Sequence, residues 1–293
     1  MGAPARPAVP WERARATASL ARRGRRVGLY LLLIGGGLIY TAPFLWMLST
    51  SLKEPAMAIQ IPPVWFPRPL VWGNYLRAWT ILPFFDFTKN SITYAVASLV
   101  GELLSCSLAA YGFSRLAFHG RTFWFAVVLA TMMLPSQVTL IPQFILFKNL
   151  GWLDTLLPLI VPTYFGNAFY IFLLRQFFLT LPTELDDAAK IDGASPLDVY
   201  WRIILPLAKP ALATVAIFSF VFRWNDFFGP LIYLSTPEQM TIAVGLQLFR
   251  GQWGTDFSLL MAASTVAVLP IIVLFFFAQK TFVQGIALTG VKG

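Results

Sequence analysis

The chain has 293 residues, of which 57% are hydrophobic and only 12% are charged, and its mean hydropathy is +0.69. A soluble domain is typically about 45–50% apolar and about 25% charged, so the composition excludes a soluble protein, and the length is too short for two large domains. The single Cys106 and the single His119 also exclude an internal disulfide and a histidine-rich metal site.

The net charge of +9 is unevenly distributed along the chain. Residues 1–26 contain seven arginines and one acid and supply +6 of this charge, which leaves +3 for residues 27–293. A basic segment next to an apolar span indicates the orientation in the membrane, or contact with anionic lipid heads, rather than nucleic-acid binding. We therefore expect a basic cytoplasmic tail over residues 1–26 and a transmembrane domain over residues 27–293.

Six apolar stretches are each long enough to cross about 30 Å of hydrocarbon as a helix. The first exceeds the ~7–15-residue apolar core of a signal peptide and is followed by no small-residue cleavage site, so we expect a retained anchor. With the N-terminus inside, the inner segments hold fourteen Lys and Arg residues and the outer segments six, which predicts that both termini are cytoplasmic. Proline and glycine interrupt several stretches, which suits a bundle that bends around a watery cavity. The stretches are residues 27–52, 91–113, 122–147, 156–178, 210–234 and 257–279.

Residues 179–209, between the fourth and fifth stretches, predict two short helices at the cytoplasmic face. A threonine and three acids within residues 183–187 are typical of a helix start, because acids favour the positive end of the helix dipole. Gly193 can end this helix in the left-handed conformation. Residues 195–198 begin a second helix that we expect to end at Pro206. From the residues alone, an amphipathic helix pair lying on the lipid surface explains this pattern as well as a protein-binding site does.

The spacing within this loop resembles a known signature. Asp187-Ala188-Ala189, then Gly193, then Ile203-x-Leu205-Pro206 is similar to the EAA loop of ABC importer permeases, with aspartate where that family usually has glutamate. The resemblance covers most of residues 27–293, includes the run Trp224-Asn225-Asp226-Phe227, and is closest to the maltose-type carbohydrate permeases. It implies an all-α integral membrane protein of six transmembrane helices with the type I ABC importer permease (MetI-like) fold.

In that family the loop, here about residues 180–208, contacts a cytoplasmic ATPase and transmits ATP-driven closure to the spans. This chain contains no phosphate-binding G-x-x-x-x-G-K-[ST] motif. We therefore expect a non-catalytic transport subunit without a cofactor of its own, with ATP and Mg²⁺ bound by the ATPase. The resemblance further implies two ATPase subunits, a second and different permease subunit, and an extracytoplasmic substrate-binding protein, in a bacterial cytoplasmic (inner) membrane. The residues expected to form the ATPase-coupling loop are Glu184, Asp187, Ala188, Ala189, Asp192, Gly193, Ile203, Leu205 and Pro206.

Four charged residues lie within the apolar stretches. Arg175 is three residues from the end of its stretch and is expected to reach the cytoplasmic interface. The other three lie deeper, where a charge costs at least about 2.5–3.5 kcal/mol and therefore indicates function. Glu102 and Arg223 lie near the middles of the second and fifth stretches, and Asp226 follows three residues after Arg223 on the same helix face. We predict that they form a polar cluster inside the bundle, either as a structural ion pair or as a wall of the substrate route. Sugar routes combine aromatic, amide and hydroxyl groups, which adds Gln137, Asn167, Tyr170, Trp224 and Asn225 to the candidates.

Two other classes of function are compatible with a membrane protein. An ion-coupled secondary transporter would use Glu102 and Asp226 as relay groups, but it leaves the spacing of residues 187–206 unexplained. A membrane-embedded enzyme would need a motif such as HExxH, GxSxG or DDxxD, and no stretch contains one. We therefore expect an ATP-driven importer of a carbohydrate that works by alternating access, with no catalytic residue and no metal ligand in this chain.

Overall fold

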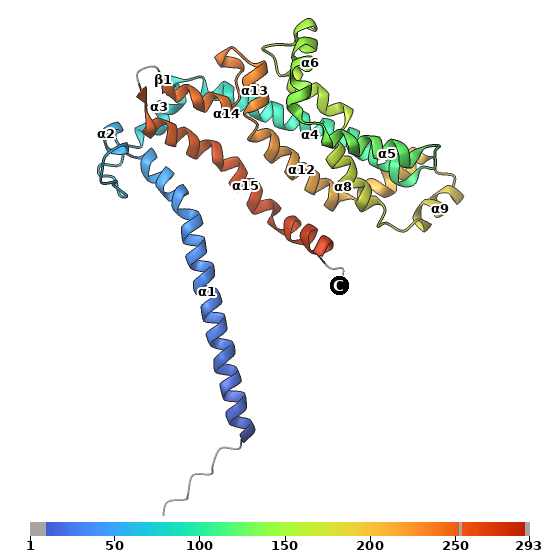
Figure 1. The fold of residues 1–293 in the computed structure, drawn as a ribbon, viewed down its shortest axis with the longest axis horizontal. Helices are drawn as coiled ribbons and strands as arrows, with labels where there is room; N and C mark the ends of the chain where they lie inside the picture. Colours follow the sequence, from blue (N-terminus) through green and yellow to red (C-terminus); the bar gives the residue numbers. More distant parts are fainter. Residues whose placement is uncertain (1–9, 252–253, 291–293) are drawn as a thin grey trace, which may run out of the picture.

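The computed structural model describes residues 10–251 and 254–290, which form an almost entirely helical bundle (Figure 1). Residues 1–9 of the predicted basic tail lie outside the described residues. The first helix, α1 (Pro10–Ser51), joins the rest of that tail to the first apolar stretch without interruption. Its apolar window is not buried by the rest of the chain. In Figure 1 the helix extends away from the bundle, which it contacts through α15 (Phe257–Gly290).

Four of the six predicted stretches are long apolar helical segments. Besides α1 and α15, they are α4 (Phe84–Arg115) and the run from α7 (Leu157–Ile160) through η2 (Val161–Phe165) to α8 (Ala168–Phe178). This run is interrupted at Gly166, which has φ +94°. Asn167 then caps α8, because its side-chain oxygen accepts hydrogen bonds from the next free backbone N–H groups.

The third and fifth stretches are bent rather than straight. The third consists of α5 (Arg121–Ala130), η1 (Thr131–Met133) and α6 (Ser136–Asn149), with 95° between its two halves. Pro135 explains the bend, because proline lacks an N–H and holds the preceding Leu134 in an extended conformation. The fifth consists of α12 (Lys209–Trp224), a break, and α13 (Phe228–Tyr233). The helical run Pro196–Leu207 precedes α12 and meets it at 76°. The described residues therefore contain four straight candidate spans, and six when each of the two bent pairs, residues 121–149 and 196–224, is counted as one span.

The loop between the fourth and fifth stretches contains the two predicted short helices. The first is α9 (Glu184–Ile191) and the second consists of α10 (Pro196–Val199), the π-helical turn η3 (Tyr200–Ile204) and α11 (Leu205–Leu207). The second helix does not end at Pro206, as predicted, but one residue later. Proline is tolerated there because it occupies the first turn of the new segment that begins after the π-helical turn.

Short elements connect the spans at the end of the bundle opposite α9 (Figure 1). The side-chain amide of Asn74 stabilises the first of these connections by donating to the backbone carbonyls of Ser51 and Lys53, at 2.9 and 2.8 Å. The two strands pair antiparallel as a small hairpin. These elements are α2 (Pro55–Ala58), α3 (Gly73–Ile81), η4 (Pro237–Gln239), α14 (Ile242–Gly245), η5 (Leu246–Phe249), β1 (Arg250–Gly251) and β2 (Gly254–Thr255).

Helix α4 is the centre of the fold, since it packs against α8, α12 and η2. At the α9 end, the largest apolar core fills the space between these helices and the short helices of the loop, with Leu174, Phe178, Tyr200 and Ile204 almost fully buried. Because burial of each large side chain contributes about 1.5–3 kcal/mol, this core holds the loop firmly against the spans.

Candidate functional site

Residues 184–207, which we call the α9–α11 segment, are fixed to the bundle by a buried ion pair. Arg115, the last residue of α4, donates from Nη1 to Asp186 Oδ2 at 3.0 Å, and the two side chains are 4% and 11% exposed. Its Nη2 donates to the backbone carbonyls of Phe178 and Leu181, both at 2.7 Å, where α8 ends. A buried guanidinium with several acceptors holds its neighbours in one geometry. The ends of α4, α8 and α9 are therefore connected by a single side chain.

The turn between α9 and α10 has the geometry that the sequence predicts. Gly193 has φ +80°, which ends α9 in the left-handed conformation. Ser195 Oγ accepts a hydrogen bond from Asp198 N, and the Asp198 carboxylate accepts one from Ser195 N, both at 3.2 Å. The hydrogen bonds from Ser195 lower the pKa of Asp198 below its ordinary value. The helix start before Glu184 is confirmed as well, although the Thr183 side chain makes no capping hydrogen bond.

Most of the residues predicted to contact an ATPase are exposed on the α9–α11 segment. Ala189 differs, because it is 7% exposed and packs into the core beneath α9. Ala189 therefore does not share the exposed surface of Ala188, from which it is turned by about 100° around the helix, and its predicted contact with an ATPase stays a prediction. Ile203 and Leu205 are half-buried against the same core and support the segment from below. The exposed members of the predicted set are Glu184, Asp187, Ala188, Asp192, Gly193 and Pro206.

The sequence prediction missed the large apolar side chains that are exposed on this segment, of which three are more than half exposed. Ile191, Leu197 and Trp201 are 87%, 60% and 56% exposed. Lys190 and Asp187 form a surface ion pair at 3.0 Å close to Ile191 in the chain. Large apolar side chains left exposed among charged ones are typical of a protein-binding surface. Ile191 stands between Lys190 and Asp192 in the sequence, and this position among charged residues was a signal that could have identified it.

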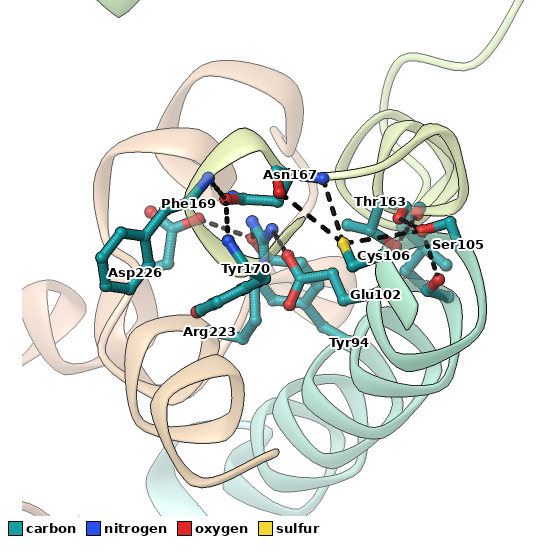
Figure 2. A network of polar contacts seen from close by, with 12 residues as sticks. Tyr94, Glu102, Ser105, Cys106, Thr163, Asn167, Phe169, Tyr170, Arg223 and Asp226 are labelled. Atoms are coloured by element: carbon teal, nitrogen blue, oxygen red, sulfur yellow. Dashed lines mark hydrogen bonds and ion pairs between the residues drawn. The ribbon is translucent and has the colours of Figure 1, made fainter. Parts of the chain in front are cut away.

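The predicted intramembrane polar cluster forms between α4 and α12, as Figure 2 shows. Arg223 Nη2 donates to Glu102 Oε1, and the two side chains are 16% and 1% exposed. Arg223 Nη1 donates to Tyr94 Oη at 3.1 Å, and Tyr94 Oη donates to Asp226 Oδ2 at 2.7 Å. The four side chains therefore form one continuous chain of polar contacts. Among the described residues, Glu102 Oε2 and Arg223 Nε have no partner.

Asp226 joins this cluster through Tyr94, and no ion pair joins it to Arg223 among the described residues. The reason is that α12 ends at Trp224, so Asp226 lies in the break and not on the helix face of Arg223. There Asp226 Oδ1 accepts from Gly229 N at 3.2 Å. The sequence prediction missed Tyr94, although Tyr94 and Glu102 are eight residues apart and therefore share one face of α4.

The polar cluster lines a cavity of about 300 Å³ between α4, α6, the α7–α8 run and the α12–α13 break. This volume is at the lower end of the ~300–1,000 Å³ of small-molecule pockets. Asn167 lines the cavity. Gln137 does not line it and is exposed, whereas Gln143, about two turns further along α6, does. The bend at Pro135 sets the direction of α6, and a pattern along the sequence does not report that direction.

Three other predicted residues do not line the cavity. Trp224 turns toward α15, where its Nε1 donates to the Ala267 carbonyl at 3.0 Å. Asn225 is exposed, and its side chain donates to the Val221 carbonyl of its own helix at 2.8 Å. Tyr170 is buried in the core between α4 and α8. Burial and helix capping therefore account for these side chains, which removes them from the candidate wall of the cavity.

Two small side chains of α4 form hydrogen bonds to the backbone of the interrupted fourth span, next to the polar cluster, as Figure 2 shows. Ser105 Oγ donates to the Thr163 carbonyl at 3.1 Å, and Cys106 Sγ accepts from the backbone N–H of Asn167 at 3.1 Å. The freed backbone groups at the Gly166 break therefore find partners on α4, as a polar backbone inside a membrane requires. Cys106 is thus a fully buried residue that packs against the start of α8.

A further polar contact lies at the end of the cavity opposite α9. Asp154, between α6 and α7, has the left-handed φ of 60°, and its backbone N–H donates to the Tyr233 carbonyl at 2.8 Å. Its Oδ1 accepts from the backbone N–H groups of Ser235 and Thr236, at 2.8 and 2.9 Å. Hydrogen bonds from Thr236 lower the pKa of Asp154 below its ordinary value. Asp154 therefore fastens the α6–α7 connection to the end of α13, next to the cavity-lining Tyr233.

A helical bundle with apolar spans, a cavity lined in part by charged residues and an exposed segment fixed to the spans indicates a membrane transport subunit. The family described as "binding-protein-dependent transport system inner membrane component" matches residues 103–288. The chain belongs to this family, the membrane permeases of ABC importers, whose partners are ATPase subunits and substrate-binding proteins.

Related proteins agree with this assignment. The chain is 32% identical to the arabinooligosaccharides transport system permease protein AraQ of Bacillus subtilis, over 92% of this chain and 96% of AraQ. It is 31% identical to the sulfoquinovosyl glycerol transport system permease protein SmoH of Agrobacterium fabrum, over 92% of this chain and 93% of SmoH. Its fold matches a chain of a bacterial ABC transporter involved in the import of the acidic polysaccharide alginate, with a TM-score of 0.79, 26% identity, and 89% and 97% of the two chains covered.

Proposed function

We propose that this chain is one permease subunit of an ATP-driven importer that moves a carbohydrate across the bacterial cytoplasmic membrane by alternating access. The observation that carries the proposal is the connection between the α9–α11 segment and the cavity. Arg115 attaches the segment to α4, and the segment continues directly into α12. The same two helices meet again at the Glu102–Arg223 ion pair.

This arrangement supports a mechanical link. Arg115 and Glu102 are thirteen residues apart on α4, which corresponds to about 20 Å along a helix. A force applied to the α9–α11 segment acts on the ends of both α4 and α12, and these helices form two sides of the cavity. Nucleotide-driven closure of an attached ATPase would therefore change the angle between the cavity walls and open the cavity to alternate sides.

The exposed face of the segment supports the ATPase as the partner. Ile191, Leu197 and Trp201 supply apolar area, and Asp187 and Asp192 supply negative charge around it. A mixture of apolar anchors and charge is typical of a specific protein interface. ATP and Mg²⁺ are bound by two copies of the ATPase in this proposal, and both termini of the permease lie on the ATPase side.

The unburied apolar face of α1 supports a second permease subunit. A helix that extends from the bundle without burying its apolar window needs lipid or another protein chain around it. We assign part of this surface to a different permease chain, so that two subunits enclose the complete route. An extracytoplasmic binding protein delivers the substrate to the opposite face of the pair.

Carbohydrate is the proposed substrate class because AraQ is named for arabinooligosaccharides and the cavity combines aromatic rings with hydroxyl and amide groups. The alternative of an ion-coupled transporter gains no support from the cluster. A relay carboxylate must release its partner during each cycle, whereas Glu102 is held by Arg223, and Asp226 is held by Tyr94 and the backbone of Gly229.

Co-purification of the ATPase in mild detergent tests this proposal. Ile191→Glu places a charge in the centre of the proposed contact and is expected to abolish recovery of the ATPase with the permease. Ile61→Glu is the matched control, because Ile61 is 91% exposed, comparable to 87% for Ile191, and lies at the opposite end of the bundle. Equal recovery of the ATPase with both variants would overturn the assignment of the contact surface.

A further inference from the structure

The walls of the cavity carry an unbalanced set of charges. Glu102 and Asp226 supply two carboxylates, and Arg223 supplies one guanidinium, so the formal charge of the lining is −1. No lysine, histidine or second arginine is among the described residues that line the cavity. Because helices of the bundle line this open cavity, a unit of charge on its wall is screened less than it would be in bulk water.

The one cation is already engaged. Arg223 donates through Nη2 to Glu102 and through Nη1 to Tyr94. Its Nε has no partner, but this nitrogen is buried by protein and belongs to the guanidinium whose charge Glu102 opposes. A carboxylate, sulfonate or phosphate group entering the cavity would need to displace Glu102 from Arg223 and would still face Asp226.

The remaining features of the cavity favour hydroxyl groups on an apolar ring. Asp226 lines the cavity, is half-buried and offers carboxylate oxygens as acceptors, whereas Glu102 is 1% exposed and its Oε2 is buried by protein. A ligand hydroxyl can donate to a carboxylate oxygen, whereas an anionic group cannot. Phe228, which is 54% exposed, also lines the cavity and can offer an aromatic face to the C–H face of a ring, whereas Tyr233 is 7% exposed and its ring stacks on Phe144.

We infer that this cavity selects uncharged, hydroxyl-bearing rings and discriminates against anionic sugars. This inference rests on the proposed function and narrows its substrate class to neutral sugars. It separates this chain from the structurally similar transporter, which is involved in the import of the acidic polysaccharide alginate. The cavity of about 300 Å³ holds a small portion of a longer chain at one time. The charge of the lining, rather than the binding protein alone, then sets the class of sugar that passes this subunit.

Equilibrium binding to the intact transporter without its binding protein tests the inference. The probes are arabinotriose, which is neutral, and a trisaccharide of galacturonic acid, which carries three negative charges, titrated by calorimetry into the complex in lipid nanodiscs. We expect the neutral trisaccharide to bind at least about 10-fold more tightly than the acidic one, because a like charge at close range in a low dielectric costs at least that factor.

Two charge-changing variants separate this effect from a purely structural role. Asp226→Asn and Glu102→Gln each remove one negative charge at a different point of the cluster, and both should reduce the preference for the neutral sugar by about 10-fold. Asp86→Asn removes a negative charge of α4 outside the cavity lining and should leave the preference unchanged. If either charge-removing variant fails to assemble, the other still provides the comparison.

The outcomes distinguish this inference from the proposed function. Equal binding of both sugars, tighter binding of the acidic one, or a preference that neither charge-removing variant changes would overturn the inference. So would binding of neither sugar by a complex that still imports a sugar with ATP, because the selective site would then lie elsewhere. Failure of the complex to import any sugar with ATP would instead count against the proposed function.

Discussion

Replacing Arg115 by methionine tests whether a buried ion pair holds the α9–α11 segment on the bundle. The substitution removes a guanidinium whose side chain is 4% exposed and leaves the carboxylate of Asp186, 11% exposed, without its cation. Removing one member of a buried pair typically costs about 3–5 kcal/mol, because the remaining charge is buried without compensation. We expect Arg115→Met to lower the free energy of unfolding by about this amount, measured by denaturant titration in lipid bicelles with tryptophan fluorescence.

Lys190→Met is the matched control for this experiment. Lys190 pairs with Asp187 of the same helix, but the two side chains are 67% and 69% exposed. This pair should therefore contribute less than about 1 kcal/mol to the free energy of unfolding. A double variant that combines Arg115→Met with Asp186→Asn removes both buried charges and should recover a substantial part of the loss. Equal losses for Arg115→Met and Lys190→Met, or no recovery in the double variant, would refute the reasoning.

Three further results are expected. Exchanging the charges of Glu102 and Arg223 in one variant should recover the assembly and transport that each single reversal loses, and an exchange without recovery in both assays counts against direct pairing. Gly229→Ala should reduce transport at normal expression, because the added Cβ would lie 2.9 Å from a carboxylate oxygen of Asp226. Gly112→Ala is the control, because its Cβ meets no atom within 4 Å and the variant should transport normally. Equal transport by the two variants would contradict this. For Asp154, whose folded-state pKa is lowered below the ordinary 3.8, the carboxylate stabilises the fold above pH 3.8 and loses that effect as the pH falls through the lowered folded-state pKa. The difference in the free energy of unfolding between the wild type and Asp154→Ala should therefore be constant near neutral pH and shrink under acid. A difference that increases under acid would contradict this prediction.

The α9–α11 segment is the part of the site that the sequence predicts best. Its helix start, its left-handed Gly193 and the capping box at Ser195 depend on residues within a few positions of one another, so local patterns are sufficient. The pairing of Glu102 with Arg223 was predictable for a different reason. Two opposite charges at similar depth in an apolar medium have few other partners.

The rest of the cavity depends on the directions of helices, which composition and spacing do not report. Pro135 predicts a break in the third stretch but not an angle of 95°, and that angle determines that Gln143 rather than Gln137 lines the cavity. Trp224 adjoins Arg223 in the sequence, but it faces α15 because adjacent residues on a helix point about 100° apart. The burial of Ala189 likewise follows from its packing into the apolar core beneath α9.

The central claim is that ATP hydrolysis on a partner drives this chain through its α9–α11 segment. The most direct measurement is uptake of arabinotriose into proteoliposomes that contain this permease, its partner permease, the ATPase and the binding protein. The account predicts uptake that requires ATP inside the vesicles, continues when a protonophore collapses the ion gradients, and is lost with Ile191→Glu. Uptake that continues without ATP and stops with the protonophore would contradict it.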